Sequence, residues 1–119
     1  MIIPSFVKNY TIEELQELLN PLDGIKLALL FGSRAKGTEH SLSDYDIALL
    51  SDAKDPWEFG KYYTQILELL DVPERALDII NLEEAQGFLL ENILEKYIIL
   101  KGSEDEFREL LSTKQKTSQ

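Results

Sequence analysis

Hydrophobic and polar positions follow two different periods along this chain. After Asp55-Pro56, apolar side chains recur at helical spacing and form one stripe, which comprises Phe59, Tyr63, Ile66, Leu67 and Leu70. Short apolar runs of strand length occupy residues 26–31, 45–50, 76–82 and, more weakly, 97–100. The pattern predicts strands interleaved with helices, and therefore one sheet with helices packed against it.

Capping sequences mark the predicted helix starts. The TIEE sequence at residues 11–14 predicts a capping box, and residues 55–58 place proline at the first helical position. Asn81 is predicted to open a third helix. The inner side of that helix is expected to comprise Ala85, Phe88, Leu89 and Ile93. A last helix is predicted to begin at Ser103 and to end at Leu111.

Length and composition predict a small globular protein. The 119 residues suit one domain over 1–111, followed by a flexible polar tail over 112–119. The chain has no cysteine, which suits a cytoplasmic protein. No apolar run approaches the roughly 20 residues that span a bilayer, and no signal peptide is expected.

The charge of the chain argues against nucleic-acid binding. Twelve basic and 22 acidic side chains give a net charge of −10, and the basic residues are scattered apart from Arg34 and Lys36 and two lysines in the tail. Polynucleotide phosphates would be repelled by such a surface. A small phosphorylated ligand that arrives with a divalent metal remains compatible, because the metal supplies positive charge.

A glycine-serine turn follows the first predicted strand. Gly32 lets a ligand approach the backbone, and a short helix over Ser33–Lys36, ended by Gly37, offers unpaired N–H groups that suit phosphate oxygens. The simpler interpretation is a strand-to-helix turn with Ser33 as the N-cap. Both interpretations are compatible with the sequence, which lacks the ending of a Walker A loop.

Two carboxylates one residue apart open the second predicted strand. Asp44 and Asp46 project from the same face because side chains alternate along a strand, and they lie about 7 Å apart by strand rise. Such a pair repels unless a cation lies between them, and Mg²⁺ prefers carboxylate oxygens. The alternative is a solvated loop that enters a strand. Asp46 fits that alternative less well, since it lies in an apolar run.

Asp78 interrupts the third apolar run in the same manner. The alternative to a functional role is a structural carboxylate paired with a basic group such as Arg75. Three carboxylates from adjacent strands would form a two-metal site of the kind that serves phosphoryl displacement. The single histidine, His40, is predicted to be an exposed loop residue and not a zinc ligand.

Taken together, Gly32-Ser33, ten intervening residues, Asp44-Tyr45-Asp46 and a later Asp78 resemble the DNA polymerase beta-like nucleotidyltransferase superfamily. The segments LFGSRAKG and SDYDIALL are most similar to its small prokaryotic branch, the minimal nucleotidyltransferase (MNT) domains. The resemblance extends over residues 26–100. It implies an α/β (α+β) fold, with a small mixed sheet whose helices pack mainly on one face.

The resemblance also implies a reaction and a partner. Gly32 and Ser33 would bind the triphosphate, and Asp44, Asp46 and Asp78 would be the catalytic residues and the ligands of two Mg²⁺ ions. The reaction implied is transfer of AMP from ATP to a hydroxyl. MNT domains act as antitoxins beside HEPN-domain toxins, and some transfer AMP to a tyrosine of the toxin. An oligomer, with a second copy or with such a partner, is compatible with the sequence.

Two alternatives belong to other functional classes. One is a binding module that neutralises a partner by complex formation without turnover, which the small size and the lack of a substrate domain favour. The other is a receiver-like signalling domain, which is also acidic and of similar length. That class requires its acidic pair after the first strand, and it leaves the glycine-serine turn unexplained.

Overall fold

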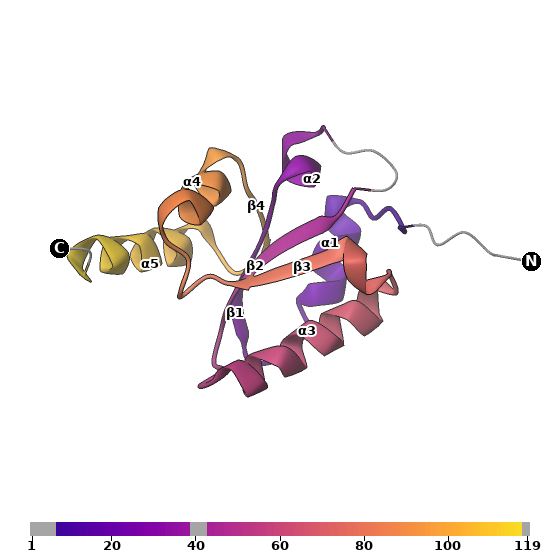
Figure 1. The fold of residues 1–119 in the computed structure, drawn as a ribbon, viewed down its shortest axis with the longest axis horizontal. Coiled ribbons are helices and arrows are strands. Elements are labelled where there is room, and N and C mark those ends of the chain that lie inside the picture. Colours follow the sequence, from indigo (N-terminus) through magenta and orange to yellow (C-terminus); the bar gives the residue numbers. More distant parts are fainter. Residues whose placement is uncertain (1–6, 39–42, 118–119) are drawn as a thin grey trace, which may run out of the picture.

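The computed structural model describes residues 7–38 and 43–117, with side chains through Lys114. Four strands form one mixed sheet in the order β3-β2-β1-β4 (Figure 1). The strands are β1 (Ile25–Phe31), β2 (Tyr45–Ser51), β3 (Leu77–Asn81) and β4 (Ile98–Lys101). β1 is antiparallel to both β2 and β4, whereas β2 and β3 are parallel. The predicted mixed sheet with interleaved helices is confirmed.

Helices connect the strands. They are α1 (Ile12–Leu19), α2 (Ser33–Lys36), α3 (Pro56–Leu70), α4 (Gly87–Glu95) and α5 (Glu104–Thr117), with a 3₁₀ turn at Glu74–Ala76. The Thr11 hydroxyl accepts from the Glu14 N–H while the Glu14 side chain accepts from the Thr11 N–H, so the predicted capping box is present. Asp55 caps α3, with proline at its first position. These two predicted helix starts are confirmed.

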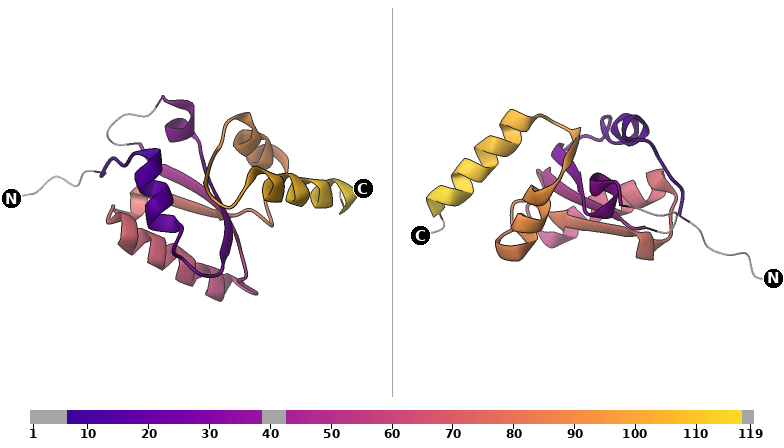
Figure 2. Two further views of the ribbon diagram at one scale, coloured as in Figure 1. Left: turned by 180° about the vertical axis from the view of Figure 1, so that it is seen from behind. Right: turned by 90° about the horizontal axis from the view of Figure 1, so that it is seen from above.

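Each face of the sheet carries its own hydrophobic cluster. Strand alternation directs Tyr45, Ile47 and Leu49 toward α1 and α3, where Ile66 and Leu70 are buried. The opposite face has a smaller cluster that includes Phe31 and Ala48 of the sheet. Its helical members are Ile93 of α4 and Phe107 of α5. In Figures 1 and 2, α4 and α5 lie together at one end of the molecule, away from α1.

The predicted third helix begins later than expected. Residues 82–84 form a turn, and α4 starts only at Gly87 with Gln86 as its N-cap. The Asn81 side chain accepts from the Glu83 N–H at 3.1 Å, two residues ahead, and this bond favours a turn over a helix start. The prediction that Phe88 and Leu89 face inward is wrong, since they are 89% and 39% exposed. Ala85 and Ile93 are buried as expected.

The last helix is longer than predicted. α5 begins after Ser103, as expected, but continues to Thr117 instead of ending at Leu111, and so extends into the predicted polar tail over 112–119. The Lys114 ammonium donates to the carbonyls of Glu83 and Ala85, both at 2.8 Å, which ties α5 to the turn before α4. His40 lies outside the described residues.

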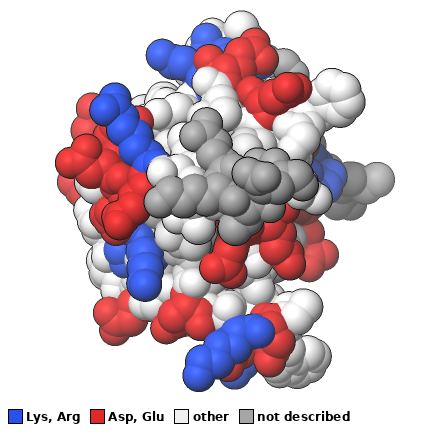
Figure 3. All heavy atoms as spheres, turned by 90° about the vertical axis from the view of Figure 1, so that its left-hand side faces the viewer, with Lys and Arg blue, Asp and Glu red and all other residues white. Residues whose placement is uncertain are grey.

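The described surface is strongly acidic. On the face shown in Figure 3, Asp and Glu side chains gather in clusters, and the Lys and Arg side chains lie apart from one another. Among the residues that the structure describes, no helix has the length and apolar character needed to cross a bilayer.

The buried stripe of α3 provides a test of the fold. Ile66→Ala is expected to lower the free energy of unfolding by about 2–5 kcal/mol, because the fully buried side chain leaves a cavity. Leu69→Ala on the same helix is the matched control, since Leu69 is 38% exposed, and a change within about 0.5 kcal/mol is expected. Urea denaturation measures both, and equal losses would contradict the orientation of α3.

Candidate functional site

The glycine-serine turn connects β1 directly to α2. Gly32 is the N-cap of α2, with φ 74° and ψ −157°, a conformation that is almost exclusive to glycine. Its carbonyl accepts from the N–H groups of Ala35 and Lys36, both at 3.1 Å. Gly37 ends the helix, as predicted, and its backbone is in the left-handed conformation. The interpretation of Ser33 as the N-cap is wrong, because Gly32 takes that position and Ser33 is the first helical residue.

Two of the three candidate acids lie side by side. In the parallel pairing of β2 and β3, Asp46 is the register partner of Asp78. Their strand neighbours Tyr45, Ile47, Leu77 and Ile79 belong to the cluster on the opposite face of the sheet. Asp46 and Asp78 therefore both point to the face of α4 and α5, on strands about 4.8 Å apart.

The glycine turn lies against the same carboxylate. A Cβ built on Gly32 would be 2.2 Å from Asp46 Oδ2 and 3.1 Å from Asp46 Cγ. The Asp46 side chain thus occupies the space that a larger residue at position 32 would need. Gly32, Asp46 and Asp78, which are far apart along the chain, converge at one site.

Asp46 has unusual electrostatics. It is half-buried, whereas Asp44 and Asp78 are exposed. Burial, assisted by the charges of Asp78 and then Asp44, raises the pKa of Asp46 from 3.8 to about 6. A cation bound beside a carboxylate in such surroundings would favour its ionised form. Asp44, one position before β2, is thus close enough to Asp46 to affect its ionisation.

The donor set is chemically suited to magnesium. Carboxylate oxygens are the protein ligands that Mg²⁺ prefers. Because Gly32 has no side chain, the Oδ2 atom of Asp46 is not covered by residue 32. Within residues 7–38 and 43–117, however, no group of three or more His, Cys, Asp or Glu side chains is gathered tightly enough to hold an ion. Metal binding by Asp44, Asp46 and Asp78 stays a prediction.

A buried arginine adjoins the site and has no role in the sequence interpretation. Arg34 follows Ser33 in α2, is 9% exposed and hydrogen-bonds across to Ser43, the residue before Asp44. In the sequence it is visible only as one of two basic residues beside the turn. The only available signal was its position next to Gly32-Ser33, because its partners lie elsewhere in the chain.

Comparison with known families decides the identity of the fold. The family described as "Polymerase beta, Nucleotidyltransferase" matches residues 13–106, which is most of the chain. This chain belongs to the polymerase beta nucleotidyltransferase family. The resemblance seen in the Gly-Ser and Asp-x-Asp segments is confirmed at this level. No curated protein sequence matches the nucleotidyltransferase significantly.

Solved structures share the fold. A chain in the crystal structure of a toxin–antitoxin with AMP-PNP is 24% identical and superimposes with a TM-score of 0.66, covering 89% of this nucleotidyltransferase and 88% of that chain. A chain in the complex of a tri-AMPylated Shewanella oneidensis HEPN toxin with an MNT antitoxin is 20% identical, with a TM-score of 0.59 and coverages of 88% and 87%. A chain in the MntA-HepT toxin–antitoxin structure is 21% identical, with a TM-score of 0.57 and coverages of 87% and 84%.

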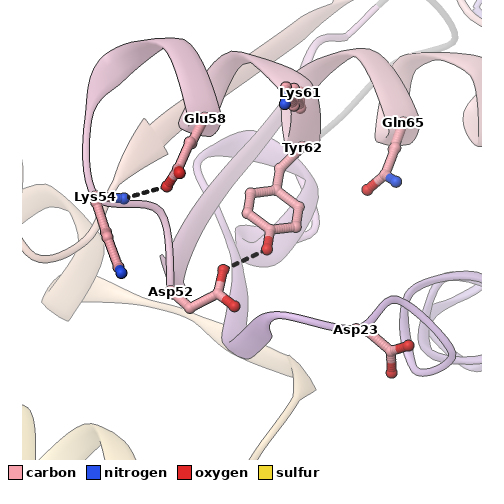
Figure 4. Close-up of a pocket in the computed structure, with 7 residues that line it drawn as sticks. All are labelled: Asp23, Asp52, Lys54, Glu58, Lys61, Tyr62 and Gln65. Atoms are coloured by element: carbon pink, nitrogen blue, oxygen red, sulfur yellow. Dashed lines mark hydrogen bonds between the residues drawn. The ribbon is translucent and has the colours of Figure 1, made fainter.

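A polar cavity of about 400 Å³ lies at the other end of β2 (Figure 4). Asp52 lines it and lies six positions after Asp46, a distance of about 20 Å along the strand direction. The Tyr62 hydroxyl donates to Asp52 at 2.5 Å, and this bond raises the pKa of Tyr62 to about 12. Asp52 is therefore already paired with Tyr62. Its distance from Asp46 means that the cavity is separate from the candidate site.

Gly32→Ala tests the contact between the turn and Asp46. Positive φ costs alanine about 1–2 kcal/mol at either Gly32 or Gly37, and the ψ of Gly32 adds to that cost. Only Gly32→Ala also displaces the Asp46 carboxylate, since a Cβ at Gly37 meets nothing within 4 Å. NMR titration of the Asp46 carboxyl is expected to show a changed pKa in Gly32→Ala and not in Gly37→Ala. An unchanged Asp46 in both variants would contradict the contact.

The raised pKa of Asp46 predicts a dependence of stability on pH. Because the folded pKa of about 6 exceeds the ordinary 3.8, the stabilising contribution is complete below pH 3.8 and is lost as pH rises through 6. An asparagine side chain cannot ionise, so the free energy of unfolding of Asp46→Asn minus that of wild type is expected to increase between about pH 4 and about pH 7. Urea denaturation across this range measures it, and a constant difference would refute the raised pKa.

Proposed function

We propose that this nucleotidyltransferase transfers AMP from ATP to a hydroxyl group, and that the acceptor is a tyrosine of a HEPN-domain toxin for which the chain is the antitoxin. One observation supports the chemistry above all: Asp46 lies in register with Asp78 and against the backbone of Gly32. Two of the three proposed acids thus lie beside the turn that we propose binds phosphate, and this proximity supports the proposal.

Each site residue has a proposed role. Gly32 and Ser33 bind the triphosphate, which the missing Cβ of Gly32 allows to approach the backbone. Asp44 and Asp46 would hold two Mg²⁺ ions, and Asp78 would supply a further ligand to the second. When bound, the metal neutralises phosphate charge and lowers the pKa of the acceptor hydroxyl.

The proposed reaction is a single in-line displacement. The acceptor oxygen forms a bond to the α-phosphorus of ATP as the bond from that phosphorus to the bridging oxygen breaks. The bridging oxygen leaves with the electron pair as part of pyrophosphate. The hydroxyl proton passes to the exposed Asp78 carboxylate and from there to solvent.

The proposed partner draws support from the structures of similar fold. One of them contains AMP-PNP, and another contains an AMPylated HEPN toxin in complex with an MNT antitoxin. This chain covers 88% and 87% of the two matched chains, so the fold is shared over most of their length. A protein acceptor would also cover the solvent-facing side of the site, where Asp44 and Asp78 are exposed.

Label transfer tests the reaction. The chain, Mg²⁺ and α-labelled ATP are incubated with the HEPN-domain toxin proposed as its partner, and label on a tyrosine of that toxin is expected. Asp46→Ala is expected to reduce the rate about 1,000-fold, since loss of metal-held charge removes several kcal/mol of transition-state stabilisation. Asp23→Ala, an exposed acid at the far end of the sheet, is the matched control and is expected to retain the rate. Absence of label with wild type, or equal rates in Asp46→Ala, would overturn the proposal.

A binding module without turnover is the second candidate function. The observation that favours it is that no three acids of the described chain are gathered tightly enough to hold an ion. In that case a chain with both Asp44→Ala and Asp46→Ala would still neutralise the toxin in a growth assay. Under the enzymatic proposal the double variant loses neutralisation, although it still binds the partner in a pull-down.

A further inference from the structure

Arg34 is the most deeply placed charged side chain near the candidate site, and we infer that it is a positioning residue that sets the geometry of Asp44 and Asp46 relative to the Gly32-Ser33 turn. It is 9% exposed although it carries a permanent charge. Burial of a charge is costly unless hydrogen bonds and partners compensate it, so each of its contacts bears on stability. The inference rests on the proposed function, because it assigns Arg34 to the same site.

The guanidinium holds the chain immediately before the acids. Its Nη2 donates to the Ser43 carbonyl at 2.7 Å and its Nε donates to the same oxygen at 3.0 Å. Ser43 is itself buried and directly precedes Asp44. Because Arg34 directly follows Ser33, these two bonds fasten the phosphate-binding turn to the start of the acidic segment.

The same group also holds the residue between the acids. The guanidinium carbon lies 3.9 Å from the centroid of the Tyr45 ring, which is within cation–π range. Tyr45 is fully buried, and its ring points to the opposite face of the sheet from Asp46. Tyr45 and Asp46 share one planar peptide unit, so a shift of the Tyr45 backbone would also shift Asp46.

The contacts use the shape of arginine and not only its charge. Nη1 donates to Asn9 Oδ1 at 3.0 Å, while Nε and Nη2 both donate to the Ser43 carbonyl. Three nitrogens of one planar group thus bond two partners while the same group lies over the Tyr45 ring. A lysine ammonium is a compact point charge that cannot make this planar set of bonds. Arg34→Lys thus keeps the charge and removes the positioning.

Tyr45 offers a matched control within the same network. Its hydroxyl donates to the Lys8 carbonyl and accepts from the Tyr10 N–H, the residues on either side of the Arg34 partner Asn9. Tyr45→Phe removes both bonds and so also destabilises the protein, but it leaves a ring beneath the guanidinium. If Arg34 has only a structural role, Arg34→Lys and Tyr45→Phe should show the same hydrogen exchange and the same Mn²⁺ affinity when they lower the melting temperature equally.

The experiment uses the full chain and three readouts. Hydrogen exchange is expected to show faster exchange at residues 44–47 in Arg34→Lys than in Tyr45→Phe, with the rest of the sheet unchanged. Mn²⁺ titration followed by EPR is expected to show about tenfold weaker binding in Arg34→Lys and wild-type binding in Tyr45→Phe. In the label-transfer assay, the Mg²⁺ concentration for half-maximal rate is expected to rise in Arg34→Lys more than the KM for ATP.

The outcomes separate this inference from the proposed function. Wild-type exchange, Mn²⁺ affinity and Mg²⁺ dependence in Arg34→Lys would overturn the positioning role, even if transfer occurs. The same changes in Tyr45→Phe at equal melting temperature would also overturn it, because they would follow from instability. A further outcome is that wild type binds Mn²⁺ and transfers no label while Arg34→Lys still exchanges faster than Tyr45→Phe at residues 44–47. In that outcome the positioning role stands and the proposed transfer reaction fails. Should Arg34→Lys not fold, Arg34→Met and Arg34→Ala with added guanidinium ion give the same comparison, and rescue by that ion supports the inference.

Discussion

The structure depends on the parallel pairing of β2 and β3, which sets two aspartates side by side. Register pairing of Asp46 and Asp78 brings like charges onto one face of the sheet. Burial of Asp46 further increases the free-energy cost of its ionised form. An arrangement of this kind lowers stability unless a ligand offsets it. It is therefore a better indication of function than either acid alone, because the fold retains it at a cost in stability.

The rest of the fold keeps this pair in place. β1 delivers Gly32 to the carboxylate of Asp46, where no side chain other than hydrogen fits. The hydrophobic cluster under α1 and α3 buries the residues on either side of each acid, and so fixes which way the acids point. On the other face, an ion pair at 3.1 Å joins Lys36 at the end of α2 to Glu95 at the end of α4. This contact links α4 to the short helix that follows the Gly32-Ser33 turn.

Local signals in the sequence were enough for most elements and for the acids, but not for their surroundings. The caps at Thr11 and Asp55 were legible because a cap involves only residues within one turn. The helix start predicted at Asn81 is wrong for the same reason, because an asparagine side chain can accept a hydrogen bond in a turn as readily as at a helix start. The expectation that Asp44 and Asp46 share a face followed from alternation along one strand, whereas the pairing of Asp46 with Asp78 is set by contact between distant segments. The role of Arg34 was unreadable because its partners Asn9, Ser43 and Tyr45 are brought to it only by the fold.

The outer position of β3 in the sheet also bears on solubility. Apart from Asp78, the residues that precede Asn81 in this strand are apolar. Outer strands with open backbone groups are templates on which other chains can add, and a charged side chain discourages such growth. The exposed Asp78 thus also acts as a gatekeeper against aggregation, so selection for a soluble chain favours the same carboxylate that the chemistry would need.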